Sequence, residues 1–168
     1  PVIGLEPSCL LTLRDEFQAM LPGEDSDALA GQALLFEEFL AREHDAGRLS
    51  LPLQPLDLSH ALVHGHCHQK AFDTLEDLEK TLRLVPGLET ETIQSGCCGM
   101  AGAFGYRPEN QDISMRMAQD ALLPAVRDAG ADTILVADGT SCRHQIKDGA
   151  GRPAVHVAQV LADALADR

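Results

Sequence analysis

Short apolar runs alternate with segments of helical periodicity from one end of the chain to the other. Such a succession is typical of βαβ units, in which consecutive strands lie parallel and helices cover the sheet. We therefore expect an α/β fold with a mainly parallel, open sheet of about five strands and helices on both faces. The expected strands are Val2–Leu5, Ala61–His64, Glu89–Ile93, Thr133–Ala137 and Ala154–Val157.

Helices are expected between these strands, from the spacing of apolar residues and from residues that start or end helices. Thr74 with Asp77 three positions later resembles a capping box that uses the shorter acid. Pro124 should kink the last turn of a helix that Gly130 ends. The expected helices are Leu10–Met20, Asp27–His44, Thr74–Leu84, Gln111–Asp128 and Ala158–Ala166.

The length and composition favour one ordinary domain. The chain has 168 residues, of which 45% are hydrophobic, so it can bury a core without disulfides. Residues 46–59, which contain two prolines, are the one stretch that resembles an internal linker. Because the sequence begins at Pro1 rather than at a methionine, we expect a single cysteine-rich α/β domain over residues 1–168 that was cut from a longer chain.

Charge and cysteine count exclude several classes of function. A formal net charge of -13 with scattered basic residues argues against a nucleic-acid partner. No apolar run approaches the roughly 20 residues that span a bilayer, so we expect no direct membrane insertion. Five cysteines are an odd number for a disulfide framework. A cytoplasmic protein fits best, with attachment to the inner face of the membrane through partners left open.

Every cysteine follows one of the expected strands. Cys9 follows the first strand, Cys67 the second, Cys97 and Cys98 the third, and Cys142 the fourth. The carboxyl ends of parallel strands lie along one edge of a sheet, where ligands bind, so these thiols are expected to converge. For Cys9 alone, a small buried hydrophobic residue is an equally good interpretation.

The adjacent cysteines are harder to explain by packing. Gly96, Gly99 and Gly102 surround Cys97 and Cys98. Glycine permits positive φ and lets backbone N–H groups come close to a thiolate or sulfide. Gaps of 29 and 43 residues separate the pair from the other thiols, and these are not the spacings of a zinc finger or a bacterial ferredoxin. Thiolates bind both iron–sulfur clusters and zinc, so the donor type leaves both open.

Histidines alternate around Cys67 in the sequence His-Gly-His-Cys-His. On an extended segment His64, His66 and His68 would point to one side. A histidine-bound metal, a role beside a thiolate centre through hydrogen bonds or protons, and inert histidines are all open. We expect His66 and His68 to adjust the properties of a cysteine-bound centre.

Gly-Cys-Cys-Gly-Met-Ala-Gly at 96–102, with His-Cys-His at 66–68 and Ser-Cys-Arg-His at 141–144, resembles the cysteine-rich CCG domain. That family occurs in the iron–sulfur protein of glycolate oxidase, in heterodisulfide reductase and in the C-terminal part of FAD-linked D-2-hydroxyacid dehydrogenases. The sequence around these motifs is most similar to the last group. The resemblance implies an iron–sulfur centre whose ligands would be Cys67, Cys97, Cys98 and Cys142.

Two positions depart from the family pattern. Gly139 stands where the family has the first cysteine of a closing CxxC, so one expected thiolate is missing. Cys9 would match the closing cysteine of a preceding repeat, and as a metal ligand it would either complete a second site in the full enzyme or bind at the same edge in this fragment. An apolar run ending in Ser-Cys occurs before both Cys9 and Cys142, which suggests a duplicated unit that is truncated at its front.

The resemblance implies an electron-transfer domain that would work with a flavin dehydrogenase domain or subunit and a ferredoxin-like domain. FAD is expected only on another domain, and this piece alone should not oxidise a hydroxyacid. Two alternatives stay open. One is a domain in which zinc holds the fold or a docking surface, and the other is a dithiol redox protein that uses Cys97 and Cys98. A recombinant fragment could also carry zinc or no metal.

Overall fold

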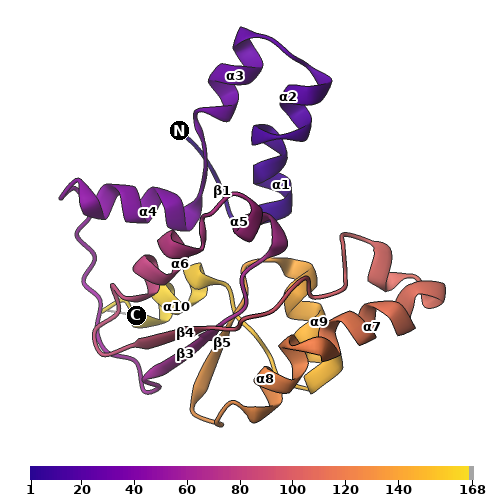
Figure 1. The fold of residues 1–168 in the computed structure, drawn as a ribbon. Helices are drawn as coiled ribbons and strands as arrows, with labels where there is room; N and C mark the ends of the chain where they lie inside the picture. The colour runs from indigo at the N-terminus through magenta and orange to yellow at the C-terminus, as the bar shows by residue number, and fades with distance from the viewer. Residues whose placement is uncertain (167–168) are drawn as a thin grey trace.

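Parallel strands and flanking helices make up the computed structural model, which describes residues 1–166 (Figure 1). The central strand β3 (His60–Val63) pairs in parallel with β4 (Glu89–Thr92) and with β5 (Thr133–Val136). A second sheet joins β1 (Val2–Gly4) to β2 (Ala33–Leu35), also in parallel. The α/β class and the parallel pairing are confirmed, but one open sheet of five strands is wrong because the strands divide into sheets of three and two.

Helices cover both faces of the three-stranded sheet. Ala61 and Val63 point toward a core built with α4 (Phe36–Asp45), α6 (Leu75–Leu82) and α10 (Val157–Ala164). Leu62 points to the opposite face. There it packs against the core layer of three further helices, α7 (Gln111–Asp120), α8 (Leu122–Asp128) and α9 (Thr140–Ala150).

The N-terminal segment differs from its expected form. Instead of one helix over Leu10–Met20, α1 (Pro7–Leu11), a 3-10 turn η1 (Thr12–Arg14) and α2 (Glu16–Met20) follow one another. The expected helix Asp27–His44 is also wrong, because α3 (Glu24–Ala30) ends and β2 intervenes before α4. Pairing with β1 gives the backbone of β2 a partner and buries Ala33 and Leu35, and this outweighs local helix propensity.

Two further helix expectations need correction. The helix expected over Gln111–Asp128 breaks at Ala121, where φ is -143°. Pro124 lies in the first turn of α8 rather than in a kinked last turn, since it has no N–H to bond the carbonyl of residue 120 and its ring would clash there. The Thr74 side chain makes no capping hydrogen bond to α6.

The expected strand Ala154–Val157 forms only one bridge, between Val155 and Val136. Two helices that begin at cysteine-bearing turns, α5 (Cys67–Ala71) and α9, were not expected from periodicity, and two 3-10 turns, η2 (Phe104–Tyr106) and η3 (Pro108–Asn110), precede α7. Residues 46–59 run along the core, where Leu53 bridges Leu165 and Gln54 donates to the carbonyl of Ala164. Within residues 1–166 no helix has the length and apolarity needed to cross a membrane.

Candidate metal centre

Three neighbouring strands bring four thiols to the carboxyl edge of their sheet. Cys67 begins α5 after β3, Cys97 and Cys98 lie in the loop after β4, and Cys142 is the third residue of α9 after β5. The Sγ atoms of Cys98 and Cys142 are 3.3 Å apart. The thiols of Cys67 and Cys98 are near enough to Cys97 to lower its pKa. The four sequence-distant thiols therefore gather at one edge of the sheet.

The pKa values of the four thiols shift in opposite directions. Hydrogen bonds from Cys67 and Cys98 lower the pKa of Cys97, and its sulfur also accepts the backbone N–H of Gly99 at 3.4 Å. The hydrogen bond with Cys98 lowers the pKa of Cys142 to about 5, although burial opposes it. The interaction with Cys97 raises the pKa of Cys67, and the interactions with Cys142 and Cys97 raise that of Cys98. These directions favour thiolates at Cys97 and Cys142, and the thiolate is the form of cysteine that binds a soft metal.

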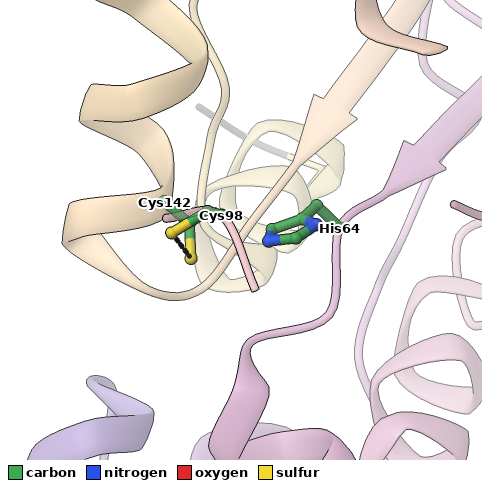
Figure 2. Close-up of side chains that lie close together, drawn as sticks. All are labelled: His64, Cys98 and Cys142. Atoms are coloured by element: carbon green, nitrogen blue, oxygen red, sulfur yellow. Dashed lines mark hydrogen bonds between the residues drawn. The ribbon is translucent and has the colours of Figure 1, made fainter. Parts of the chain in front are cut away.

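His64 lies beside Cys98 and Cys142, although the sequence left a histidine-bound metal only as one open alternative and favoured His66 and His68 as the residues that adjust the centre. One of its ring nitrogens and the sulfurs of Cys98 and Cys142 all lie within 4.8 Å of one another (Figure 2). Its Nδ1 lies 3.0 Å from the Oγ of Ser95. The available signal was strand alternation, which places His64 on the same face as Leu62 and therefore in the layer that holds the two buried cysteines.

The expectation that the three histidines lie on one extended segment is wrong. The chain turns into α5 at Cys67, and His66 caps this helix by accepting the backbone N–H of His68 at Nδ1, at 3.2 Å. The rings of His66 and His68 stack with their centroids 5.2 Å apart, and Cys67 Sγ lies 3.9 Å from Nδ1 of each. These three residues form a second group of closely spaced donors, separate from that of His64.

His66 fills the space beside Gly139. A β-carbon at Gly139 would lie 2.4 Å from Cδ2 of His66 and 3.2 Å from the sulfur of Cys142. Since the His66 ring is buried and held as a helix cap, a larger residue at this position would have to displace it. The glycine that stands where a cysteine was expected is therefore required by the packing of this chain.

The glycines near the adjacent cysteines differ in role. Gly99 has φ +92°, and a β-carbon there would lie 2.2 Å from the carbonyl oxygen of Ser114. Gly102 also has a positive φ, of +63°, but open space around it. Gly96 has neither restriction, and its carbonyl accepts a hydrogen bond from Nζ of Lys70 at 3.1 Å. Gly99 is thus the glycine whose conformation and close contact both shape the loop.

Lys70 was also not selected from the sequence. Its Nζ donates to the carbonyls of Ser95 and Gly96, which lie just before the adjacent cysteines. Burial lowers the pKa of Lys70, and the charges of the four thiols act against this effect. Its position three residues after Cys67 was the available signal, because residues at this spacing share a helix face.

Cys9 lies on α1, which packs against α5. It is exposed on α1, and neither group of close donors found within residues 1–166 includes it. The preceding Glu6, however, reaches the centre's surroundings. Its carboxylate accepts the backbone N–H of Thr140, the first residue of α9, at 2.8 Å.

A buried polar network supports α5 from behind. Nε2 of Gln69 donates to Glu37 at 2.7 Å and to Asp138 at 3.0 Å. Asp138 also accepts the backbone N–H of Val157 at 2.9 Å. Burial, and then repulsion from Asp138, raise the pKa of Glu37 to about 8. This network connects α4, α5 and the loop before α9.

Comparison with known proteins agrees with this geometry. The profile of the family described as "Cysteine-rich domain", CCG, matches residues 61–147, a range that runs from β3 into α9. The chain belongs to this family. The matched range contains all four gathered thiols and His64, while Cys9 lies outside it.

Dehydrogenases are among the relatives of this cysteine-rich chain. It is 36% identical to a subunit of the anaerobic glycerol-3-phosphate dehydrogenase of Escherichia coli (strain K12), over 99% of the chain and 41% of the relative. D-2-hydroxyglutarate dehydrogenases of Escherichia coli (strain K12) and Pseudomonas putida are 28% and 29% identical, over 96% of the chain and 15% of each relative. No solved structure matches.

The chain thus spans less than half the length of these relatives. Of these three relatives, the glycerol-3-phosphate dehydrogenase subunit has the higher sequence identity to the chain. The sequence was instead expected to be most similar to the hydroxyacid dehydrogenases.

Proposed function

We propose that this chain is an electron-transfer domain that holds an iron–sulfur centre through Cys67, Cys97, Cys98 and Cys142. The observation that carries the proposal is the convergence of four thiols, from the carboxyl ends of three neighbouring strands, at one edge of the sheet, where each shifts the pKa of another. Two of these sulfurs have lowered pKa values, and thiolates are the ligands that iron–sulfur clusters use. When bound, such a cluster supplies one-electron oxidation and reduction.

The surrounding residues would adjust the charge of this centre. The N–H of Gly99 points at the sulfur of Cys97, and hydrogen bonds to sulfur raise a cluster's reduction potential. Lys70 adds a positive charge near the adjacent cysteines. Both effects favour the reduced state, which carries one more negative charge.

His66 is oriented as a hydrogen-bond donor. Burial lowers the pKa of His66, so its ring is neutral at neutral pH. Because Nδ1 accepts the N–H of His68, the single ring proton resides on Nε2. A β-carbon added at Gly139 would lie 3.3 Å from this nitrogen and 3.2 Å from the sulfur of Cys142. Both atoms therefore border the same small space, and the Nε2–H faces the region of the centre.

The names of the relatives support a dehydrogenase as the parent activity. One relative is named for glycerol-3-phosphate and two for D-2-hydroxyglutarate, so the proposed substrate class is a small anionic alcohol, including 2-hydroxyacids. We infer that FAD on a partner domain or subunit oxidises it, and that electrons pass through a ferredoxin-like domain to this one. A cytoplasmic location, with attachment to the membrane only through partners, fits this arrangement.

Anaerobic purification of the whole protein tests the proposal. We expect a brown protein with iron, acid-labile sulfide and visible absorption, all of which Cys98→Ala should lose. Met117→Ala, at an exposed methionine of α7, is the matched control and should keep them. Unchanged iron and sulfide in Cys98→Ala would overturn the assignment. Stoichiometric zinc without sulfide would instead support a zinc-held domain, and a metal-free protein with a reversible dithiol would support thiol redox chemistry.

A further inference from the structure

The imidazole of His64 is buried with one nitrogen unused. The ring is 1% exposed, and its Nε2 makes no hydrogen bond to any atom of the part of the chain that the structure describes. Leaving a buried polar atom unpaired costs roughly 1–3 kcal/mol. A histidine kept in such a place calls for a partner that protein atoms do not supply.

The position of His64 is held from two sides. Its backbone N–H donates to the carbonyl of Val136 at 2.8 Å, which extends the pairing of β3 with β5 beyond Val63. Its Nδ1 lies 3.0 Å from the hydroxyl of Ser95 in the loop after β4. All three strands of the sheet therefore fix where the ring points, and Figure 2 shows it facing the two cysteines.

The hydrogen bonds of His64 and His66 favour opposite protonation patterns. A serine hydroxyl can accept a hydrogen bond from Nδ1–H of His64, and this leaves the lone pair of a neutral ring on Nε2. In His66 the Nδ1 accepts a backbone N–H, so Nε2 carries the proton. Metal ligation needs an unprotonated nitrogen whose partner nitrogen is hydrogen bonded. Of the two buried histidines, His64 meets this requirement.

The spacing of the three donors suits one metal ion. A nitrogen of His64 and the sulfurs of Cys98 and Cys142 lie within 4.8 Å of one another, and the two sulfurs are 3.3 Å apart. Tetrahedral ligands at metal distances near 2.1 Å for nitrogen and 2.3 Å for sulfur are separated by roughly 3.5 Å. A small inward movement of the ring therefore completes the geometry.

We propose that Nε2 of His64 is a ligand of the metal centre, beside Cys98 and Cys142 on its buried side. The inference rests on the proposed function and deepens it, because it adds a donor to the same centre. A neutral imidazole brings no negative charge, unlike a thiolate. It would therefore hold the reduction potential higher than thiolates alone, as histidine ligands do in other iron–sulfur proteins.

Cobalt(II) titration of the whole metal-free protein, with thiols kept reduced, tests the ligand. We expect His64→Ala to weaken cobalt binding by about 100-fold or more, at or above the range for losing a hydrogen-bond partner of a ligand. The cobalt absorption bands should shift as one ligand is lost. The control is His60→Ala, at the exposed other end of β3, which should bind cobalt like the unchanged protein. A folded His64→Ala protein with unchanged affinity and spectrum would overturn the proposal.

A second measurement needs no substitution, in case His64→Ala fails to fold. Protein with isotope-labelled histidine is loaded with an NMR-active cadmium isotope, and a direct cadmium–nitrogen coupling at Nε2 of His64 is expected. Absence of this coupling in metal-loaded protein contradicts the ligand. Failure of the proposed function looks different, since the protein would then bind cobalt and cadmium through His64 but assemble no iron and sulfide.

Discussion

Cys9 and Cys142 have the same local setting and opposite environments. Each follows a serine, and each is the third residue of a helix that comes after a parallel strand. Cys142 is 2% exposed and pairs with Cys98, whereas Cys9 is exposed. The strand before Cys142 lies in a three-stranded sheet with helices packed around it, while the strand before Cys9 has one partner strand. Local sequence places a thiol at a helix start, but the surrounding elements decide whether it meets other donors.

The two regions are nevertheless connected. Glu6, just before α1, accepts the first N–H of α9 at 2.8 Å, and the carbonyl of Leu5 lies 2.8 Å from Nε2 of His156. The buried pair of Glu37 and Gln69 continues this connection to α5. In this chain the N-terminal region therefore supports the helices that carry Cys67 and Cys142.

Replacing each of the two cysteines with alanine, one at a time, is the strongest test of the comparison. Cys142→Ala removes a buried sulfur that shares a proton with Cys98, so we expect the bound metal to fall to background. Cys9→Ala removes an exposed thiol outside both donor groups and should leave the metal content unchanged. Iron, zinc and sulfide analysis of both variants is the measurement, and equal losses would show that the two thiols bind the same centre.

The loop around Gly99 is a second difference, because it carries Cys98, whose sulfur lies 3.3 Å from that of Cys142. In Gly99→Ala the new β-carbon would overlap the backbone of Ser114 at a positive φ. We expect the free energy of unfolding to fall by about 2–4 kcal/mol. Gly102→Ala, with positive φ but open space, should cost only about 1 kcal/mol. Chemical denaturation of both variants measures this, and equal costs would mean that backbone conformation alone sets the effect.

The positions of most strands along the chain, and of the cysteines that follow them, were predictable because they depend on short-range patterns. Strands expected from the sequence are present at β1, β3, β4 and β5, and each cysteine follows its strand as expected. β2 was missed because residues 33–35 form a strand only by pairing with Val2–Gly4, about thirty positions earlier in the chain. Helix propensity is a local property of the sequence, so it cannot predict a strand that depends on this distant pairing.

The site was predictable in its thiols but not in its histidines. His64, His66 and His68 look equivalent in a motif of alternating residues, yet the start of α5 at Cys67 separates them. His64 stays on the sheet and enters the core, while His66 becomes a helix cap. Only the turn between strand and helix distinguishes these roles, and it depends on Gln69 and on the network beneath it.

The buried network of Glu37, Gln69 and Asp138 predicts that the stability of the protein depends on pH. Since burial raises the pKa of Glu37 from 4.5 to about 8, its protonated form is favoured in the folded state. Stability should be highest below pH 4.5 as far as this group is concerned, and should fall as the pH rises from 4.5 toward 8. Between low and mildly basic pH, Glu37→Gln should lose roughly 2 kcal/mol less stability than the unchanged protein. This is smaller than the pKa shift of Glu37 alone implies, because Asp138 shares the repulsion.

Urea unfolding of the unchanged protein and of Glu37→Gln, from acid to mildly basic pH, measures the difference. Parallel curves over this range would contradict the assignment of the pH dependence to Glu37. Glu38→Gln is not a suitable control because Glu38 binds Arg14. Glu109→Gln, in the 3-10 turn before α7, changes the same charge away from the network.

The smallest expected effect concerns the contact of Glu6, just before the helix of Cys9, with the start of the helix that carries Cys142. Burial would raise the pKa of Glu6, but hydrogen bonds from Thr140 and Ser8 outweigh it and hold the pKa below its usual value. The contribution of Glu6 is therefore complete above its ordinary pKa and disappears as the pH falls through the lowered one. Glu6→Gln should cost less than about 1 kcal/mol at neutral pH, as for a partly exposed carboxylate at a helix start, and nothing in strong acid. If the cost were instead independent of pH, Glu6 would act through packing, and the connection between the regions of Cys9 and Cys142 would not be electrostatic.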